Sequence, residues 1–183
     1  MRIISGTAKG RRLLTIPGTD TRPTTDRIKE SIFDIIQFSV RDAAVADLFA
    51  GTGQMGIEAL SRGASNCVFF DIREECVKTI RKNIETAGFK DKAQVCQKDY
   101  RTLFSENARN SYDIVFLDPP YRSGLLNEAL ALSTKFDILK AHGIIICESA
   151  ADEILTEVHA PYAKGREYRY GSVKITLVSK TGE

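Results

Sequence analysis

Uninterrupted apolar stretches alternate with amphipathic stretches along the chain from residue 44 onward. The apolar stretches predict buried strands at 45–50, 67–71, 93–97, 113–118 and 143–149. Between them, apolar residues recur on one helical face and predict helices at 55–63, 74–88, 101–106 and 125–134. Such strands, separated by amphipathic helices, indicate a parallel sheet with helices on both faces. We therefore expect an α/β fold of the Rossmann-like kind, with a doubly wound, mainly parallel sheet.

The N-terminal segment departs from this alternation. Residues 2–5 and 11–16 predict two short strands joined by a glycine-containing turn. A helix is expected at 26–37, because its apolar residues share one face, and Thr24 or Thr25 can cap its first turn. The fold is therefore expected to begin with a small β-rich arm and one helix.

The C-terminal segment departs from it as well. A further helical stretch is expected after residue 150, followed by two antiparallel strands at 166–170 and 173–178. The last strand of the sheet is therefore predicted to be antiparallel. The predicted division of the chain is an N-terminal arm and helix over 1–41 and an α/β domain over 42–183.

The charge of the chain is small overall but unevenly spread. The 183 residues carry a net charge of +2. Residues 1–41 contain eight Lys or Arg and four Asp or Glu, a net of +4, which leaves −2 for the remainder. A basic arm on a near-neutral body indicates contact with a polyanion. The basic residues of the arm include Arg2, Lys9, Arg11, Arg12 and Arg22.

Composition narrows the class of protein further. No apolar run approaches the roughly 20 residues that a membrane-spanning helix needs, and the first residues lack the apolar core of a secretory signal. We expect a cytoplasmic protein without membrane contact, and a monomer. The cysteines form no CxxC pair, so we expect buried free thiols and no metal site. They are Cys67, Cys76, Cys96 and Cys147.

A glycine-rich segment follows the first strand of the predicted parallel sheet. Asp47, Phe49 and Ala50 lead into Gly51 and Gly53, whose missing side chains allow a tight turn and close approach of a ligand. In sheets of this kind, ligands bind beyond the carboxyl ends of the strands. The segment is therefore a candidate cofactor loop.

The next two strands end in residues suited to bind an adenosine. Asp71 lies twenty residues after Gly51, where a carboxylate can accept hydrogen bonds from both ribose hydroxyls. Asp99 can reach the adenine amino group, and Tyr100 or Ile72 can flank the ring. Dinucleotides and S-adenosylmethionine both carry an adenosine. Asp47 favours S-adenosylmethionine, whose ammonium group it can hold through water or the loop backbone.

The strand at 113–118 ends in Asp118-Pro119-Pro120-Tyr121. Two prolines fix a rigid turn, which aims the Asp118 carboxylate and the Pro119 carbonyl into one small volume. Both groups accept hydrogen bonds, so they can hold the two N–H donors of an exocyclic base amine. Tyr121 offers a flat face on which a base can stack. The motif therefore indicates transfer of a methyl group to a base nitrogen.

This motif resembles the signature of methyltransferases that act on adenine N6 in DNA, guanine N2 in RNA or glutamine in proteins. A wider set of motifs is similar, in order, to the RsmD-type 16S ribosomal RNA (guanine-N2)-methyltransferase family. The motifs are RIISGTAKGRRL at 2–13, RPTTDRIKESIFDII at 22–36, DLFAGTGQMGIEALSRGA at 47–64 and DPPYRSGLL at 118–126. The resemblance implies a class I methyltransferase fold, S-adenosyl-L-methionine as the cofactor and ribosomal RNA as the partner.

Carried over by position, the resemblance gives further residues a role. Thr24 and Thr25 lie in the motif that contacts the methionine end of the cofactor, and the basic residues of the arm contact RNA. Arg122, just after the turn, can meet a phosphate of the target nucleotide or remain a solvated side chain. Because the arm is small, we expect the RNA to be presented within a small-subunit ribonucleoprotein.

Other functions remain open from the residues alone. A DNA adenine-N6 methyltransferase would use the same turn, but it usually needs a separate region to read base edges, for which this chain has little room. A protein-glutamine substrate is disfavoured by the basic arm. A dinucleotide-dependent oxidoreductase would share the glycine loop but leaves Asp118–Tyr121 unexplained. A non-catalytic RNA-binding module would leave the same residues without a purpose.

Overall fold

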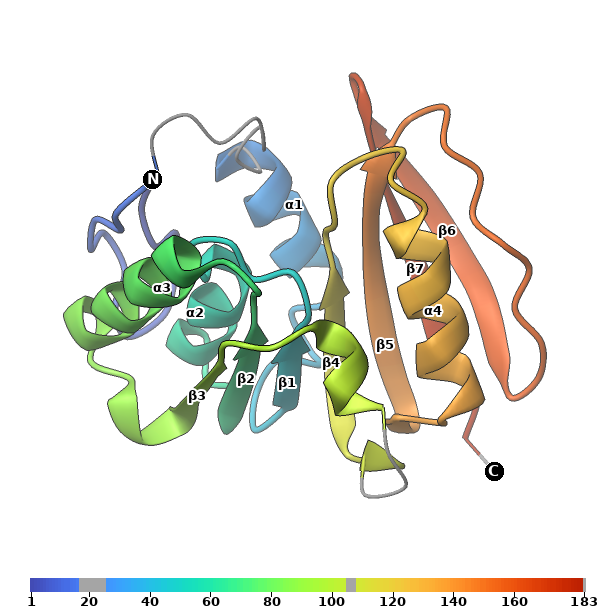
Figure 1. The fold of residues 1–183 in the computed structure, drawn as a ribbon, viewed down its shortest axis with the longest axis horizontal. Helices are drawn as coiled ribbons and strands as arrows, with labels where there is room; N and C mark the ends of the chain where they lie inside the picture. Colours follow the sequence, from blue (N-terminus) through green and yellow to red (C-terminus); the bar gives the residue numbers. More distant parts are fainter. Residues whose placement is uncertain (17–25, 105–107, 183) are drawn as a thin grey trace. The chain divides into compact units, whose positions relative to one another are not determined.

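The computed structural model of the protein describes residues 1–16, 26–104 and 108–182. The chain forms two compact units, Met1–Asp99 and Tyr100–Glu183, each described here by itself (Figure 1). The predicted boundary between residues 41 and 42 falls inside the first unit. The arm belongs to that unit, and its backbone groups form hydrogen bonds with side chains of three of the unit's helices.

The first unit contains a three-stranded parallel sheet in the order β3-β2-β1. Asp47 and Phe69 are partners at the carboxyl ends of β1 and β2, so the segments that follow these two strands lie at one edge of the sheet. Helix α2 packs against β1 and β2, and α3 packs against β3. The strands are β1 (Ala44–Asp47), β2 (Asn66–Phe70) and β3 (Ala93–Cys96); the helices are α1 (Asp26–Ile35), α2 (Gln54–Ser61), α3 (Glu74–Ala87) and the 3₁₀ turn η1 (Lys90–Lys92).

The helices of this unit form where the apolar pattern predicts them. In α3, Val77, Ile80 and Ile84 are buried on one face, and Gly88 ends the helix with a φ of 81°. Helix α2 is buried on every side, so it lies too close to the sheet for a side chain at Gly56. A Cβ there would lie 2.3 Å from the Phe69 ring.

The arm reverses direction as predicted, but its two expected strands are reduced to one isolated bridge between Arg2 and Arg12. The physical reason is a competition for backbone partners. The amides of Ile4 and Ser5 donate to a carboxylate of α2, and the Leu14 amide donates to a side chain of α3. The arm therefore bonds to helices instead of extending its own ladder.

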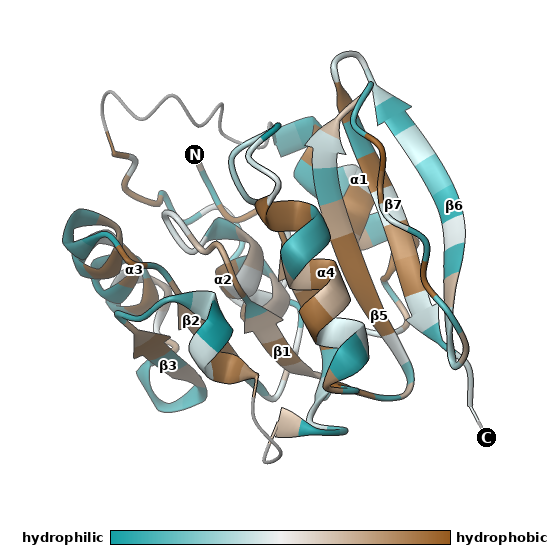
Figure 2. Ribbon diagram, turned by 45° about the vertical axis from the view of Figure 1, so that its right-hand side comes forward, coloured by the Kyte–Doolittle hydropathy of each residue, from teal (hydrophilic) through white to brown (hydrophobic). Residues whose placement is uncertain are grey.

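The second unit contains a four-stranded sheet in the order β4-β5-β7-β6. Strands β4 and β5 are parallel, whereas β7 is antiparallel to both β5 and β6, as predicted for the end of the chain. Figure 2 shows β5 and β7 as largely hydrophobic and the edge strand β6 as largely hydrophilic. The elements are η2 (Tyr100–Leu103), β4 (Tyr112–Leu117), α4 (Leu125–Lys135), β5 (Leu139–Ala150), β6 (Tyr162–Tyr170) and β7 (Val173–Lys180).

The helical stretch predicted after residue 150 is wrong, because residues 151–161 contain no helix. Their backbone groups bond to side chains of neighbouring elements. Asn127 of α4 bonds to the Ile154 carbonyl and the Thr156 amide, and Lys174 of β7 donates to the Glu153 carbonyl. These tertiary bonds replace the bonds of a helix.

The cysteines of both units are free, and three of the four are buried. Cys96 is half-buried. In the parts of the chain that the structure describes, no helix is both long and apolar enough to span a membrane.

Candidate active site and nucleic-acid interface

The glycine loop, residues 47–56, comprises the last residue of β1, the turn that follows and the first residues of α2. Gly51 and Gly53 have φ angles of 55° and 79°, a region that other residues rarely adopt. The Gly53 amide donates to the Ala50 carbonyl at 2.6 Å and closes a tight turn. A Cβ built on Gly51 meets no atom within 4 Å, so a ligand can approach the backbone there. The loop has the form that the sequence predicts.

Asp71 follows β2 and bonds to this loop. Its Oδ2 accepts from the Gly51 amide at 3.0 Å, and its Oδ1 accepts from the Arg73 amide at 2.9 Å. The structure therefore brings together the acid and the glycine that lie twenty residues apart. Ile72 is 67% exposed beside them and offers an apolar surface. A carboxylate acceptor, an accessible apolar side chain and a bare backbone turn fit the ribose and the ring of an adenosine.

Asp47 is buried inside the loop, with 2% exposure. Its Oδ2 accepts from the Gly56 amide at 3.2 Å. Burial raises the pKa of Asp47 to about 7, against the opposing effect of the backbone amides of Gly56 and Phe49. In this structure Asp47 shapes the loop from within. Its expected part in holding the cofactor's ammonium group remains a prediction.

The other expected cofactor residues differ in accessibility. Phe49 is half-buried and Ala50 is buried, and the Ala50 amide donates to the carbonyl of Phe70 at the end of β2. Asp99 is half-buried at the end of the first unit. Tyr100 begins the second unit and is 5% exposed, with the Arg101 guanidinium 4.9 Å above its ring. Of the two side chains expected to flank the adenine, Ile72 is the accessible one.

Three expected residues lie outside the described part of the chain. They are Arg22, Thr24 and Thr25. Their expected contacts with RNA and cofactor remain predictions from the sequence.

The expected target site, Asp118–Tyr121, follows β4 in the second unit. Leu117 pairs with Cys147, so the parallel register places Asp118 beside Glu148 of β5. The Tyr121 hydroxyl donates to Glu148 Oε1 at 2.7 Å, and Glu148 is 5% exposed. The hydrogen bond fixes the Tyr121 ring relative to the strand ends. Glu148 is a site residue that the sequence analysis missed, although an acid ending an apolar strand was the signal that identified Asp71.

The residues after Tyr121 tie the turn to the segment that follows β5. The Arg122 guanidinium lies 3.0 Å from both carboxylate oxygens of Asp152, and its amide donates to Glu153. Ser123 Oγ donates to the Pro120 carbonyl at 2.6 Å. Arg122 thus has an acidic partner in this structure, and a phosphate contact by Arg122 would have to compete with Asp152.

The arm presents its basic residues to solvent. Arg2, Lys9, Arg11 and Arg12 are all exposed. Arg2 lies 3.4 Å from Asp26, and Arg11 donates to the Thr86 carbonyl at the end of α3 at 2.8 Å. Such a surface can contact phosphates, and the helix contact holds part of it in place.

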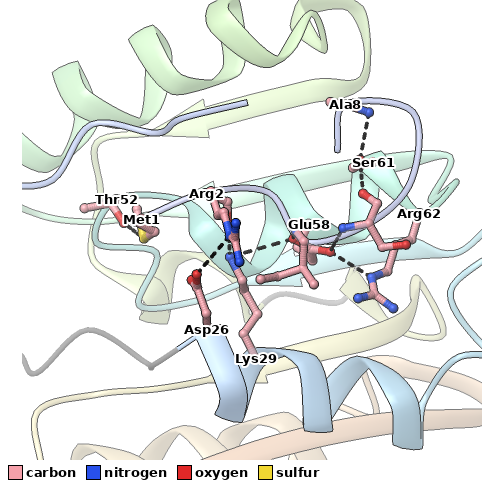
Figure 3. A network of polar contacts seen from close by, with 11 residues as sticks. Met1, Arg2, Ala8, Asp26, Lys29, Thr52, Glu58, Ser61 and Arg62 are labelled. Carbon is pink, nitrogen blue, oxygen red and sulfur yellow. Dashed lines mark hydrogen bonds and ion pairs between the residues drawn. The ribbon is translucent and has the colours of Figure 1, made fainter. Parts of the chain in front are cut away.

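A buried carboxylate, Glu58 of α2, anchors the arm (Figure 3). Its two oxygens accept from the Ile4 and Ser5 amides at 2.8 and 3.0 Å. Lys29 of α1 and Arg62 pair with the same carboxylate at 3.7 and 2.8 Å, and neither Glu58 nor Lys29 is exposed. Burial lowers the pKa of Lys29, while Glu58 opposes that shift. The sequence analysis missed both residues, because each lies among apolar residues of a helix.

Comparison with known proteins places the whole chain in one family. Residues 1–179 match the family described as Conserved hypothetical protein 95. The Bacillus subtilis protein YlbH is 37% identical over 184 residues, which span 100% of both chains. Ribosomal RNA small subunit methyltransferase D of Escherichia coli is 32% identical over 185 residues, which span 100% of this chain and 91% of that protein.

Solved structures share the fold over most or all of the chain. The Escherichia coli protein yhhF has a TM-score of 0.87 and 30% identity, with 100% of this chain and 99% of that chain covered. An RNA methyltransferase from Salinibacter ruber, solved with S-adenosyl-L-homocysteine, has a TM-score of 0.67 at 17% identity, covering 88% and 95%. These likenesses confirm the predicted Rossmann-like fold class. The chain belongs to the Conserved hypothetical protein 95 family, which confirms the RsmD-type resemblance of its sequence motifs.

Proposed function

We propose that the protein transfers a methyl group from S-adenosyl-L-methionine to the exocyclic N2 of a guanine in small-subunit (16S) ribosomal RNA. The observation that carries the chemistry is the Asp118–Tyr121 turn at the end of β4, with the Tyr121 hydroxyl held by Glu148. Full-length membership of a family that includes Ribosomal RNA small subunit methyltransferase D supports the substrate.

Each half of the reaction has its own residues. S-adenosyl-L-methionine, when bound, supplies an electrophilic methyl group on sulfur. The glycine loop and Asp71 would hold its methionine and ribose parts, and Ile72 would pack on its ring. This arrangement leaves the chemistry to the residues of the target turn.

An exocyclic base nitrogen is a poor nucleophile because its lone pair is delocalised into the ring. Asp118 and the Pro119 carbonyl would each accept one of its N–H groups, which favours the pyramidal nitrogen of the transition state. The nitrogen would take the methyl group that S-adenosyl-L-methionine supplies, and S-adenosyl-L-homocysteine would leave. Asp118 then accepts the proton that the nitrogen must lose. Tyr121 would stack on the base and fix its plane.

The arm would contribute affinity for RNA but would not select the base that is methylated. Arg2, Lys9, Arg11 and Arg12 are exposed and can neutralise phosphates, so binding should weaken steeply with salt. Four cations on a small arm favour a preformed RNA surface, and we propose a small-subunit ribonucleoprotein as the substrate. We propose that the enzyme acts there as a monomer, in the cytoplasm.

The test is transfer of labelled methyl to small ribosomal subunits that lack the modification, with free ribosomal RNA and duplex DNA in parallel. We expect label in the subunit RNA, as N2-methylguanosine in nucleoside analysis. Label as N6-methyladenine in DNA would overturn the proposed substrate and keep the chemistry of the turn.

Two variants, one directly after β4 and one near its start, test the mechanism. Asp118→Ala should lower the rate by roughly 10³-fold while S-adenosylhomocysteine still raises the melting temperature. Asp113→Asn is the matched control, because Asp113 lies at the other end of β4 and pairs with Lys140. Equal activity of Asp118→Ala and the wild type would overturn the mechanism.

A further inference from the structure

The arm bonds to helices α1, α2 and α3 of the first unit, and its attachments to α2 and to Asn83 of α3 differ in what else they touch. On α2, Glu58 binds the Ile4 and Ser5 amides, and Ser61 binds the Ser5 carbonyl and the Ala8 amide (Figure 3). This attachment involves the arm, α1 and α2. The second attachment, through Asn83 of α3, also reaches the glycine loop.

Asn83 bonds to the arm and the loop with one side-chain amide. Its Oδ1 accepts from the Leu14 amide at 2.7 Å. Its Nδ2 donates to the Leu14 carbonyl at 3.2 Å and to the Thr52 carbonyl at 2.9 Å. Asn83 has no exposed surface. An amide nitrogen has two N–H donors, so one is directed to the arm and the other to the loop.

The loop end of this connection lies where the backbone is most adaptable. Thr52 stands between Gly51 and Gly53, both with positive φ, and glycine reaches many backbone conformations at little cost. A fixed Thr52 carbonyl therefore selects one conformation of the loop. If the loop changes conformation, the Asn83 side chain must either lose its hydrogen bond to the Thr52 carbonyl or rotate to follow it. Rotation would break its hydrogen bonds to Leu14.

We propose that Asn83 is a positioning residue that couples the glycine loop to the basic arm. A cofactor that fixes the loop stabilises the arm through Asn83, and RNA bound to the arm strengthens cofactor binding by the same factor, because coupling between two sites is reciprocal. The inference rests on the proposed function for the identity of both ligands. Its physical basis is the set of three hydrogen bonds from one buried amide.

Hydrogen exchange with S-adenosylhomocysteine tests the coupling without RNA. The reporters are the amides of Ile3 and Gly10, which bond within the arm to the Arg11 and Ile3 carbonyls. Neither amide bonds to Asn83 or to Met1, whose sulfur lies 3.7 Å from the Thr52 hydroxyl of the loop. In the wild type we expect saturating S-adenosylhomocysteine to slow their exchange about tenfold, within the usual range of coupling between sites. In Asn83→Ala we expect less than about a twofold change.

Ser61→Ala is the matched control, because it removes an attachment of the arm to α2 but leaves the connection to the loop. Exchange of the arm should be faster in this variant, yet S-adenosylhomocysteine should still slow it. Asn83→Asp serves as a second variant if Asn83→Ala does not fold. An ionised aspartate keeps an acceptor for the Leu14 amide but cannot donate to the Leu14 and Thr52 carbonyls, so the coupling should be lost.

The outcomes separate this inference from the proposed function. The coupling would be overturned if S-adenosylhomocysteine slowed exchange of the arm amides as much in Asn83→Ala and Asn83→Asp as in the wild type. It would also be overturned if S-adenosylhomocysteine did not slow exchange of these amides in the wild type. The affinity for S-adenosylhomocysteine should rise about tenfold when small ribosomal subunits are present. If the ligand orders the arm through Asn83 but subunits leave its affinity unchanged, the coupling stands and RNA as the arm's partner is overturned.

Discussion

The glycine loop and the Asp118–Tyr121 turn both follow a strand of a parallel pair, but they are held in opposite ways. In the loop, buried or half-buried carboxylates accept hydrogen bonds from backbone amides, and the glycines have no side chains to cover the backbone. In the turn, prolines fix the backbone and side chains bond to side chains, as Tyr121 does to Glu148. The backbone of the loop is therefore held by side-chain carboxylates from outside the turn, whereas the backbone of the Asp118–Tyr121 turn is restricted by its own prolines.

Removing the carboxylate of Asp71 should break the loop half of this comparison with the largest effect. Asp71→Ala loses the acceptor of the Gly51 amide and the expected acceptor of the ribose hydroxyls. We expect the affinity for S-adenosylhomocysteine, measured by calorimetry, to fall about 100-fold, or ~2.8 kcal/mol. Asp91→Ala, in the exposed η1 turn, is the control and should bind normally. Equal affinities would remove Asp71 from the site.

Gly53→Ala tests whether the loop backbone is as constrained as its angles indicate. Gly53 has a φ of 79°, and a Cβ there would lie 3.3 Å from Ile57 and Ile80. We expect a loss of about 2 kcal/mol in the free energy of unfolding, measured with urea. Gly124 is the matched control, since it also precedes a helix with a φ of 78° but has open space around it. Gly124→Ala should lose only about 1 kcal/mol. Identical losses would show that the angle alone matters.

Asp47 makes the stability of the loop depend on pH. Its pKa of about 7 in the folded protein lies above the ordinary value of 3.8, so the folded state binds its proton more tightly than the unfolded state does. The resulting stability is present at low pH and is lost as the pH rises toward and through 7. Between pH 6 and 8 the free energy of unfolding should fall by about 1.4 kcal/mol in the wild type relative to Asp47→Asn. The same difference in unfolding free energy between the wild type and Asp47→Asn at pH 6 and at pH 8 would contradict this prediction.

Tyr121→Phe probes the turn and should have the smallest effect on stability. The variant keeps the ring but removes its hydrogen bond to Glu148, which should cost about 1 kcal/mol of unfolding free energy. We expect the methylation rate to fall roughly tenfold through a less well oriented ring. Tyr168→Phe in β6 is the control, and it should leave both measurements unchanged. A larger effect in the control than in Tyr121→Phe would argue against the proposed role.

The sequence predicted the repeating elements well because burial imposes a period on them. Strands β1 to β5, helices α2 to α4 and the closing pair β6 and β7 all overlap the segments that the sequence predicts, although β5 and β6 each begin four residues earlier than predicted. The sequence assigned Gly51 and Asp71 to one candidate cofactor site, and the structure joins the two residues by a hydrogen bond that the sequence did not predict. The prediction of a helix after residue 150 was wrong because the backbone of this segment forms hydrogen bonds with the side chains of Asn127 and Lys174. A local sequence pattern does not indicate such contacts.

By itself the sequence determined the order of elements, the glycine loop, the Asp118–Tyr121 turn and the family, because each depends on residues close together in the chain or on a repeated period. Only the tertiary structure decided the roles of Glu58, Asn83 and Glu148. Each is a polar residue within a helix or strand, and its partner lies far away in the sequence. Asn83, for example, bonds to Leu14 at a separation of 69 residues and to Thr52 at 31. Burial gives such residues their importance, since a polar group removed from water must find its hydrogen bonds inside the protein.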